Sequence, residues 1–171
     1  REKVIRDGSK DTAFDMHALA RAATTLQSGL KTDAERATTL NHWLGLTSKQ
    51  RAIELVTQYM PIFLTQKHQP RKTLMTSKSA KANPEDLEAL KTEQRRIFNI
   101  SEKLKAVTIA ENTKALLTIG SALLDTYLSL KKTRALIDYD DLIEKAHNLL
   151  GSPTDVSWVH YKLDGGIDHI L

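Results

Sequence analysis

The feature that most constrains the fold is a stretch of roughly fifty residues, beginning at Pro84 and running to about Lys132, that contains no second proline. Apolar side chains recur within it at three-, four- and seven-residue spacings: Leu90, Ile97, Ile100, Leu104 and Val107. This is the period of a helix packed along one face. Because helices of this length are unusual in globular domains, we expect an interruption near residues 110–113 or a bend at Gly120.

Helical patterns also cover most of the sequence before this stretch. We predict a helix from Asp11, as its N-cap, to about Gln27, with an apolar stripe that includes Phe14, Leu19 and Leu26. Residues 32–35 (TDAE) have the spacing of a capping box and open a helix that runs to Leu44.

The next predicted helix is capped by Thr47, and Pro61 disrupts or kinks its end. Asn83, Pro84 and Glu85 follow the order of N-cap, first-turn proline and first-turn acid. Further helices are expected over residues 138–150, with Asp138 as the cap, and from residue 154 or 155 to about 163.

Residues 62–83 break the helical period. Short apolar runs at 62–64 and 73–75 flank Gln69 and Pro70, and they are expected to pair as one small β-hairpin. Residues 167–171 read as the start of a strand after Gly165 and Gly166. The predicted fold class is therefore mainly α, a multi-helix subdomain with long helices, one small hairpin and a C-terminal strand.

The composition of the chain argues against several other fold classes and kinds of site. The chain has 171 residues, enough for one domain with a core, and its 5% aromatic content and seven glycines argue against an all-β fold. It contains no cysteine, which excludes disulfides and thiolate metal sites and fits a cytoplasmic location. No apolar run approaches the roughly 20 residues that span a bilayer.

The positive charge of the chain is concentrated in one segment. Thr65–Asn83 contains five cations and no acid, while the other 20 Lys and Arg residues are outnumbered by 21 acids. A local basic stretch suits contacts with the phosphates of DNA, and it is equally typical of a solvated loop. The candidate DNA-binding residues are Lys67, Arg71, Lys72, Lys78 and Lys81.

No motif for catalysis is present. The sequence has no glycine-rich Lys-Ser/Thr loop for a nucleotide phosphate and no HExxH pair for zinc. Four acids cluster at Asp138, Asp140, Asp141 and Glu144, and they form either a magnesium site or a helix cap with first-turn acids; we favour the cap. His160 and Asp164, four residues apart, are interpreted as a local hydrogen bond.

The two tryptophans can be interpreted in two ways, as base-stacking residues or as core residues. In a DNA-binding protein, Trp43 and Trp158 would stack on bases, with roughly 1–3 kcal/mol per base. Each lies within an amphipathic helical pattern, so we predict that each packs in a core.

The C-terminal part resembles a known family. Residues 135–143 (ALIDYDDLI) and 158–171 (WVHYKLDGGIDHIL) resemble the segment before the Walker B strand of UvrD/Rep-like superfamily 1 DNA helicases, and most closely the AddA helicase–nuclease subunits. That family has Asp-(Tyr/Phe)-(Asp/Ala)-(Asp/Glu)-Leu at the position of residues 138–142. The resemblance extends less strongly over Phe63–Asn83 and the long helix that follows.

The resemblance implies an internal fragment that ends just before the Walker B motif. Residues 1–135 would form a helical accessory subdomain of the type called 1B, and residues 136–171 would return into the first RecA-like domain. The parent would be an ATP-dependent 3′–5′ DNA helicase, with a nuclease domain if it is AddA-like, acting in double-strand-break repair and recombination. It would bind ATP and magnesium, associate with an AddB-like subunit and work at the nucleoid.

Two functions follow for the chain itself. In the first, it contacts duplex and single-stranded DNA and binds neither ATP nor a metal. In the second, it is a helical module that docks a partner subunit. Salt-dependent DNA affinity would favour the first, and partner binding without DNA affinity would favour the second.

Overall fold

The computed structural model describes residues 1–151 and 161–162. Contacts along the chain divide it into two compact units, Arg1–Lys114 and Ala115–Leu171, and each is described by itself. The fold is mainly α, as predicted, and no strand is assigned in the described part of the chain.

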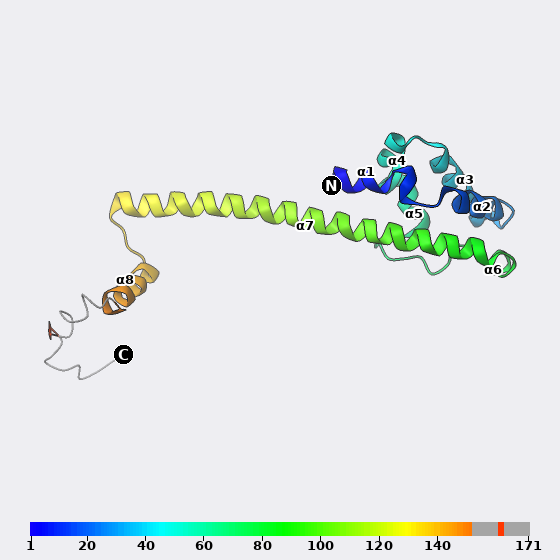
Figure 1. Cartoon of the computed structure of the whole chain (residues 1–171). Helices are drawn as coiled ribbons and strands as arrows, with labels where there is room; N and C mark the ends of the chain where they lie inside the picture. The colour runs from blue at the N-terminus through cyan, green and yellow to red at the C-terminus, as the bar shows by residue number, and fades with distance from the viewer. Residues whose placement is uncertain (152–160, 163–171) are drawn as a thin grey trace. The chain divides into compact units, whose positions relative to one another are not determined.

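The elements follow one another with short connections, except for the long loop between Phe63 and Ser77 (Figure 1). The first unit contains α1 (Glu2–Gly8), the 3₁₀ turn η1 (Asp11–Ala13), α2 (Met16–Gln27), α3 (Lys31–Gly45), α4 (Ser48–Glu54), the π turn η2 (Leu55–Tyr59), α5 (Met60–Phe63) and α6 (Ser77–Ala82). Helix α7 (Pro84–Arg134) begins in the first unit and ends in the second, which also contains α8 (Tyr139–Gly151).

An aromatic cluster forms the centre of the first unit. The rings of Trp43 and Tyr59 are stacked with centroids 3.6 Å apart, Phe14 is tilted against Trp43, and Phe63 meets Tyr59 edge-on. Trp43 is fully buried, which confirms the prediction of a core residue and excludes it from base stacking. These rings join α3, η2 and α5 into one apolar core.

The predicted seam of α7 is confirmed in its first half. Leu90, Ile97, Ile100 and Leu104 are buried, and Val107 is half-buried. Helices α2 and α3 lie side by side, and the stripe of α2 contributes Leu19 and Leu26 to the same core. The 3.6-residue period therefore identified the buried faces correctly.

Two of the predicted helix starts are confirmed at the expected residues. The Thr47 hydroxyl accepts a hydrogen bond from the backbone of Gln50, and the Gln50 side chain accepts one from the Thr47 backbone. Pro84 is the first residue of α7, and acids follow it in the first turn. The amide of Asn83 instead donates to the Ser79 carbonyl, at the end of α6.

Two other predicted starts are wrong in detail. The N-cap of α2 is Asp15, which accepts from the backbone N–H of Ala18, and Asp11 begins only the short turn η1. Helix α3 begins at Lys31 after Leu30, without a capping side chain. Asp33, which the capping-box spacing placed in the first turn, is fully buried and accepts a hydrogen bond from the Thr76 backbone. A contact across 43 residues determines its role, and sequence spacing does not show it.

Pro61 has the effect that its chemistry predicts. A proline has no N–H to donate within a helix, and the chain immediately before it forms η2, in which the Met60 N–H bonds to the Leu55 carbonyl five residues back. The helical path thus contains a π turn between α4 and α5.

The predicted hairpin is wrong. Residues 62 and 63 belong to α5, and the only pairing in the described residues is an isolated antiparallel bridge between Leu64 and Pro70. Pro70 lacks a donor, and residues 73–75 bury Leu74 and Met75 against the helices instead of extending the ladder.

The predicted interruption of α7 is also wrong. The helix is continuous for 51 residues through both residues 110–113 and Gly120. Residues 110–113 contain no glycine or proline, and one glycine costs a helix only about 1 kcal/mol relative to alanine. This penalty is too small to end a long helix made of good helix formers.

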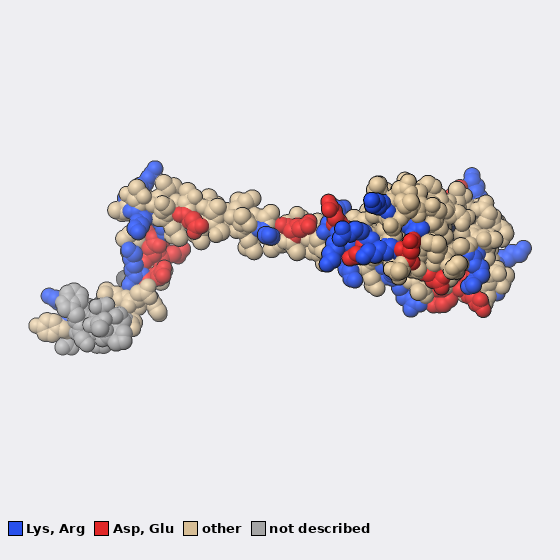
Figure 2. All heavy atoms as spheres, turned by 45° about the horizontal axis from the view of Figure 1, so that its top comes forward, with Lys and Arg blue, Asp and Glu red and all other residues tan. Residues whose placement is uncertain are grey.

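The second unit exposes many apolar side chains. They lie on the last part of α7 and on α8, and Figure 2 shows few charges over this part of α7. The α7 members are Leu116, Leu117, Ile119, Leu123, Leu124, Tyr127, Leu128 and Leu130. At 100° per residue they occupy about half of the helix circumference, and Gly120 lies within that half. We call this set the α7 apolar face.

Helix α8 follows the predicted range and is reached through a short turn. Ala135 has a left-handed backbone (φ 51°) and Asp138 caps the helix, which ends at Gly151. The expected helix from 154 or 155 to 163, the strand at 167–171, Trp158 and the His160–Asp164 pair lie outside the described residues, apart from Tyr161 and Lys162. No described helix is both long enough and apolar enough to cross a membrane. The predicted division at residue 135 stays a prediction.

Candidate nucleic-acid interface

The basic segment, residues 65–83, is a surface loop followed by a short helix. Lys67 lies in a turn in which the Thr65 N–H bonds to the Gln69 carbonyl and the His68 N–H to the Thr65 carbonyl. Lys72 lies at a bend farther along the loop, and Lys78 and Lys81 lie on α6. Figure 2 shows basic side chains projecting from the first unit with acidic ones between them.

The four lysines of this segment are exposed, and none has an acidic partner within 4.0 Å among the described residues. By contrast, Lys10, Lys91 and Lys105 each pair with an acid on their own face of the molecule. The ammonium groups of these four lysines are therefore available to bind an external anion.

Arg71 differs from the four lysines. It is half-buried, its Nε donates to the Pro61 carbonyl at 2.9 Å, and its backbone N–H donates to the Phe63 carbonyl at 2.9 Å. Its own carbonyl accepts from the side chain of Gln94 on α7. Arg71 thus fixes the loop to α5 and α7, and only its terminal nitrogens remain for a ligand.

Side chains from the helices hold the rest of the segment in place. The Arg36 guanidinium donates to the Leu74 carbonyl at 3.0 Å, and buried Asp33 accepts from the Thr76 N–H at 3.0 Å. Because the backbone is tied at these points, the lysines are displayed from a fixed scaffold, which lowers the ordering cost of binding.

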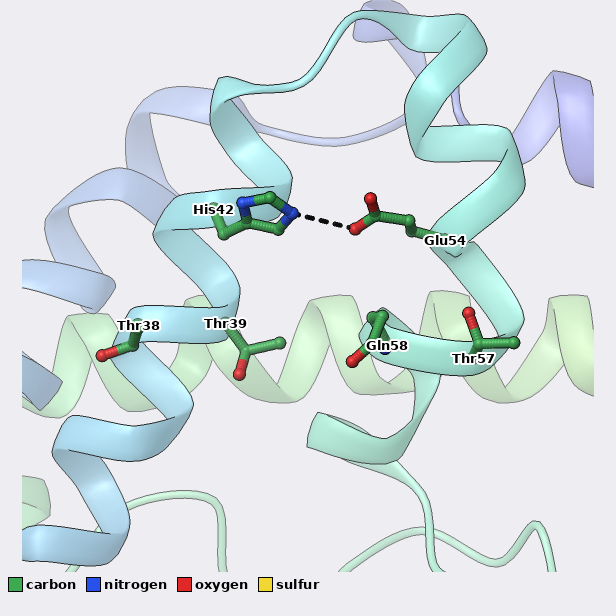
Figure 3. A pocket seen from close by; sticks show the side chains of 6 residues that line it. All are labelled: Thr38, Thr39, His42, Glu54, Thr57 and Gln58. Carbon is green, nitrogen blue, oxygen red and sulfur yellow. Dashed lines mark hydrogen bonds and ion pairs between the residues drawn. The ribbon is translucent and has the colours of Figure 1, made fainter.

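A polar groove lies beside this segment, between α3 and the chain from Glu54 to Pro61 (Figure 3). One cavity of about 360 Å³ is lined by Thr38, Thr39, His42, Glu54, Thr57 and Gln58. A second, of about 350 Å³, shares Thr39, Thr57 and Gln58 and reaches Arg36 and Arg71. We call the two together the polar groove.

One end of the polar groove is closed by a hydrogen-bonding contact between two side chains. His42 Nε2 on α3 lies 3.0 Å from Glu54 Oε2 on α4, and Figure 3 shows the two side chains pointing toward one another. The sequence does not reveal this groove, because its two walls are brought together by packing. The one local signal is Pro61, which marks an irregular helix without indicating what faces it.

The acidic cluster forms a helix cap. The Asp141 N–H donates to Asp138 Oδ1 at 2.9 Å, and the Asp138 N–H donates to Asp141 Oδ2 at 3.1 Å, a reciprocal capping box. This confirms the capping role predicted for Asp138. No group of three or more metal-ligating side chains is arranged for a metal within the described ranges.

Lys131 lies between the two capping acids. Its ammonium is 2.8 Å from Asp138 and 2.6 Å from Asp141, and the Tyr127 hydroxyl also donates to Asp138. The hydrogen bond from Lys131 holds the pKa of Asp138 well below its usual range, and the hydrogen bond to Asp138 raises the pKa of Lys131. With this cation in place, the two carboxylates do not fit a magnesium ligand set.

No family model, curated protein or solved structure matches this chain.

Proposed function

We propose that the chain is a DNA-binding accessory subdomain of an ATP-dependent 3′–5′ DNA helicase, of the 1B type. The observation that carries the proposal is the basic segment, in which four exposed lysines without acidic partners among the described residues project from a loop and from α6. The loop is tied to three helices. Such a surface supplies phosphate contacts without base contacts, as a motor that moves along any sequence requires.

The family assignment within this proposal has separate support. The resemblance of residues 135–143 and 158–171 to UvrD/Rep-like helicases of the AddA kind remains its basis. The helical fold and the capped start of α8 agree with it. In such a parent, ATP and magnesium would be bound outside this chain, which has no phosphate-binding loop and in which Lys131 engages two of the four clustered acids, Asp138 and Asp141.

The salt dependence of DNA affinity tests the proposal. If three to five phosphates are contacted, the logarithm of the binding constant should fall against the logarithm of salt concentration with a slope of about −3 to −4.5 on duplex DNA. Replacing Lys67, Lys72, Lys78 and Lys81 with Gln should weaken binding to all sequences alike and flatten that slope.

A matched variant controls for net charge. Lys3, Lys31, Lys49 and Lys103 are also exposed and lie on α1, α3, α4 and α7. Replacing these four with Gln removes the same charge and should leave most of the affinity and slope. Equal losses in the two variants would assign binding to overall charge, and no affinity at 50 mM salt would refute the proposal.

A second candidate function is docking of a partner subunit, such as the AddB-like subunit of the proposed complex. The α7 apolar face favours it, because exposed apolar patches of this kind mark interaction surfaces. Leu123→Asp should then abolish binding to the purified partner at high salt, where DNA contacts are screened. Ser129→Asp, on the polar side of the same helix, should not.

A further inference from the structure

The polar groove has free hydrogen-bonding groups at its centre. Among the described residues, no side-chain hydrogen bond engages Thr57 or Gln58, and both are exposed. Thr39, opposite them on α3, donates its hydroxyl proton to the backbone carbonyl of Glu35 and lines both cavities. Figure 3 shows Thr39 and Gln58 on opposite walls, with no side chain drawn between them.

The π turn explains why these groups are exposed. A π turn holds one more residue per turn than an α-helix and is found frequently at functional sites. Here it lies directly before Pro61, and it buries Leu55 and Tyr59 while placing Thr57 and Gln58 on the outer side, toward α3.

Positive charge lies at the opposite end from His42. The Nη1 of Arg36 donates to the Leu74 carbonyl and lies 3.6 Å from the buried carboxylate of Asp33, and Arg71 uses its Nε on the Pro61 carbonyl. Each guanidinium has further N–H groups, and guanidinium groups bind phosphate oxygens well. Arg71 belongs to the basic segment, so the groove reaches that segment at this residue.

The charge of Arg36 is partly offset by buried Asp33, whereas Arg71 has no acidic partner within 4.0 Å among the described residues. Two carboxylates line the groove: Glu54, which contacts His42 at the far end, and Glu35. No Phe, Tyr or Trp lines either cavity, and the one aromatic ring of the lining, the imidazole of His42, contacts Glu54.

From this arrangement we propose that the polar groove receives the sugar–phosphate backbone of one DNA strand, with phosphates at Arg36 and Arg71 and neutral contacts at Thr39, Thr57 and Gln58. The inference rests on the proposed DNA-binding function and extends it beyond the basic segment. Readout by backbone contacts alone predicts little preference among base sequences.

The test is a charge series at one exposed position. Fluorescence anisotropy with a labelled 20-nucleotide oligo-dT strand would be measured for the whole chain with Gln58→Glu and Gln58→Lys. A carboxylate in the groove repels phosphate, so Gln58→Glu should weaken binding about fivefold or more, and Gln58→Lys should strengthen it by a similar factor. A gain in affinity cannot come from misfolding.

Asn41 supplies the matched control, because it is an exposed amide on α3 that lines neither cavity. Asn41→Asp and Asn41→Lys should each change affinity less than twofold. If the lysines of the basic segment matter while the Gln58 series is flat, or follows the Asn41 series, the groove inference is overturned and the proposed function stands. If the wild-type chain binds no DNA, both fail.

Discussion

The Nδ1 atom of His68 lies 3.1 Å from the hydroxyl of Ser101, which joins the turn of the basic segment to a buried position on α7. His68 has a left-handed backbone (φ 57°), a conformation that is uncommon outside glycine, although asparagine, aspartate and histidine adopt it more often than other residues do. The hydrogen bond offsets part of that cost and fixes the turn that carries Lys67.

Ser101→Ala should release this turn. Loss of one neutral hydrogen bond is expected to lower the free energy of unfolding by about 0.5–1.5 kcal/mol, measured by urea denaturation. Hydrogen exchange at the His68 and Gln69 amides should become faster. Thr108→Ala is the control, because that hydroxyl bonds only to the Leu104 carbonyl of its own helix; equal effects from both variants would contradict the role of His68.

Glu93→Gln should destabilise the first unit severely. Glu93 is 4% exposed, accepts from the Tyr59 hydroxyl at 2.7 Å, and forms a two-point ion pair with Arg96, which also donates to the Gly8 carbonyl. Removing one member of a buried pair leaves an uncompensated charge and costs roughly 3–5 kcal/mol. Thermal unfolding of the variant measures this loss of stability.

Two further variants sharpen that prediction. Glu88→Gln, at an exposed pair with Arg95, should cost less than about 1 kcal/mol. Combining Glu93→Leu with Arg96→Met should recover much of the stability, since an apolar pair leaves no buried charge. If the double variant is no more stable than Glu93→Gln, the unpaired charge is not the cause.

Substitutions at Arg71 and Lys72 should separate the effect on folding stability from the effect on DNA binding. Arg71→Ala removes the contact with the Pro61 carbonyl and should cost about 1 kcal/mol of stability as well as DNA affinity. Lys72→Ala should leave stability within about 0.5 kcal/mol and reduce the salt slope of DNA binding by about one. Urea denaturation and anisotropy on the same samples distinguish the two, and identical profiles would argue against the division.

The cap of α8 should depend on pH in a defined direction. Since Lys131 holds the pKa of folded Asp138 below its unfolded value near 3.9, this contribution to stability is present above about pH 4 and is lost as the pH falls through the lowered pKa. The stability that comes from Lys131 depends on pH in the opposite direction, because the pKa of Lys131 is raised in the folded state. Its contribution is present below the unfolded value near 10.4 and is lost as the pH rises through the folded pKa.

Hydrogen exchange of the α8 amides, measured with and without magnesium, reports this cap. Asp138→Ala should speed exchange in the first turn of α8, and Asp138→Asn should speed it less, because asparagine keeps a capping oxygen. If magnesium slows exchange in the wild type and Asp138→Ala abolishes that effect, the acids form a metal site.

Local features of this fold could be predicted from sequence because their causes are local. The Thr47 and Asp138 caps and the start at Pro84 involve residues three or four positions apart, and the α7 seam follows from helical period. The break of α7 was predicted from the rarity of long helices, but no residue in the sequence imposes it.

The remaining features depend on contacts between distant segments. Asp33 lies within the predicted capping box and in the first turn of α3, yet its partner Thr76 is 43 residues away. The basic segment was located by composition, but the structural role of Arg71 comes from Pro61 and Gln94. The polar groove requires α3 and the π turn to meet, and no spacing within either one encodes that contact.

The contacts of Lys131 set a timescale for the turn between α7 and α8. Its partners Asp138 and Asp141 are seven and ten residues away, and Tyr127 and Asp138 are eleven apart. Chain segments of about ten residues close in roughly 10–100 ns, and helices form within about a microsecond. The long-range pairs of the first unit, such as Arg96 with Gly8 across 88 residues, must search far more chain conformations. We therefore expect this corner to form early in folding, before the aromatic core has assembled.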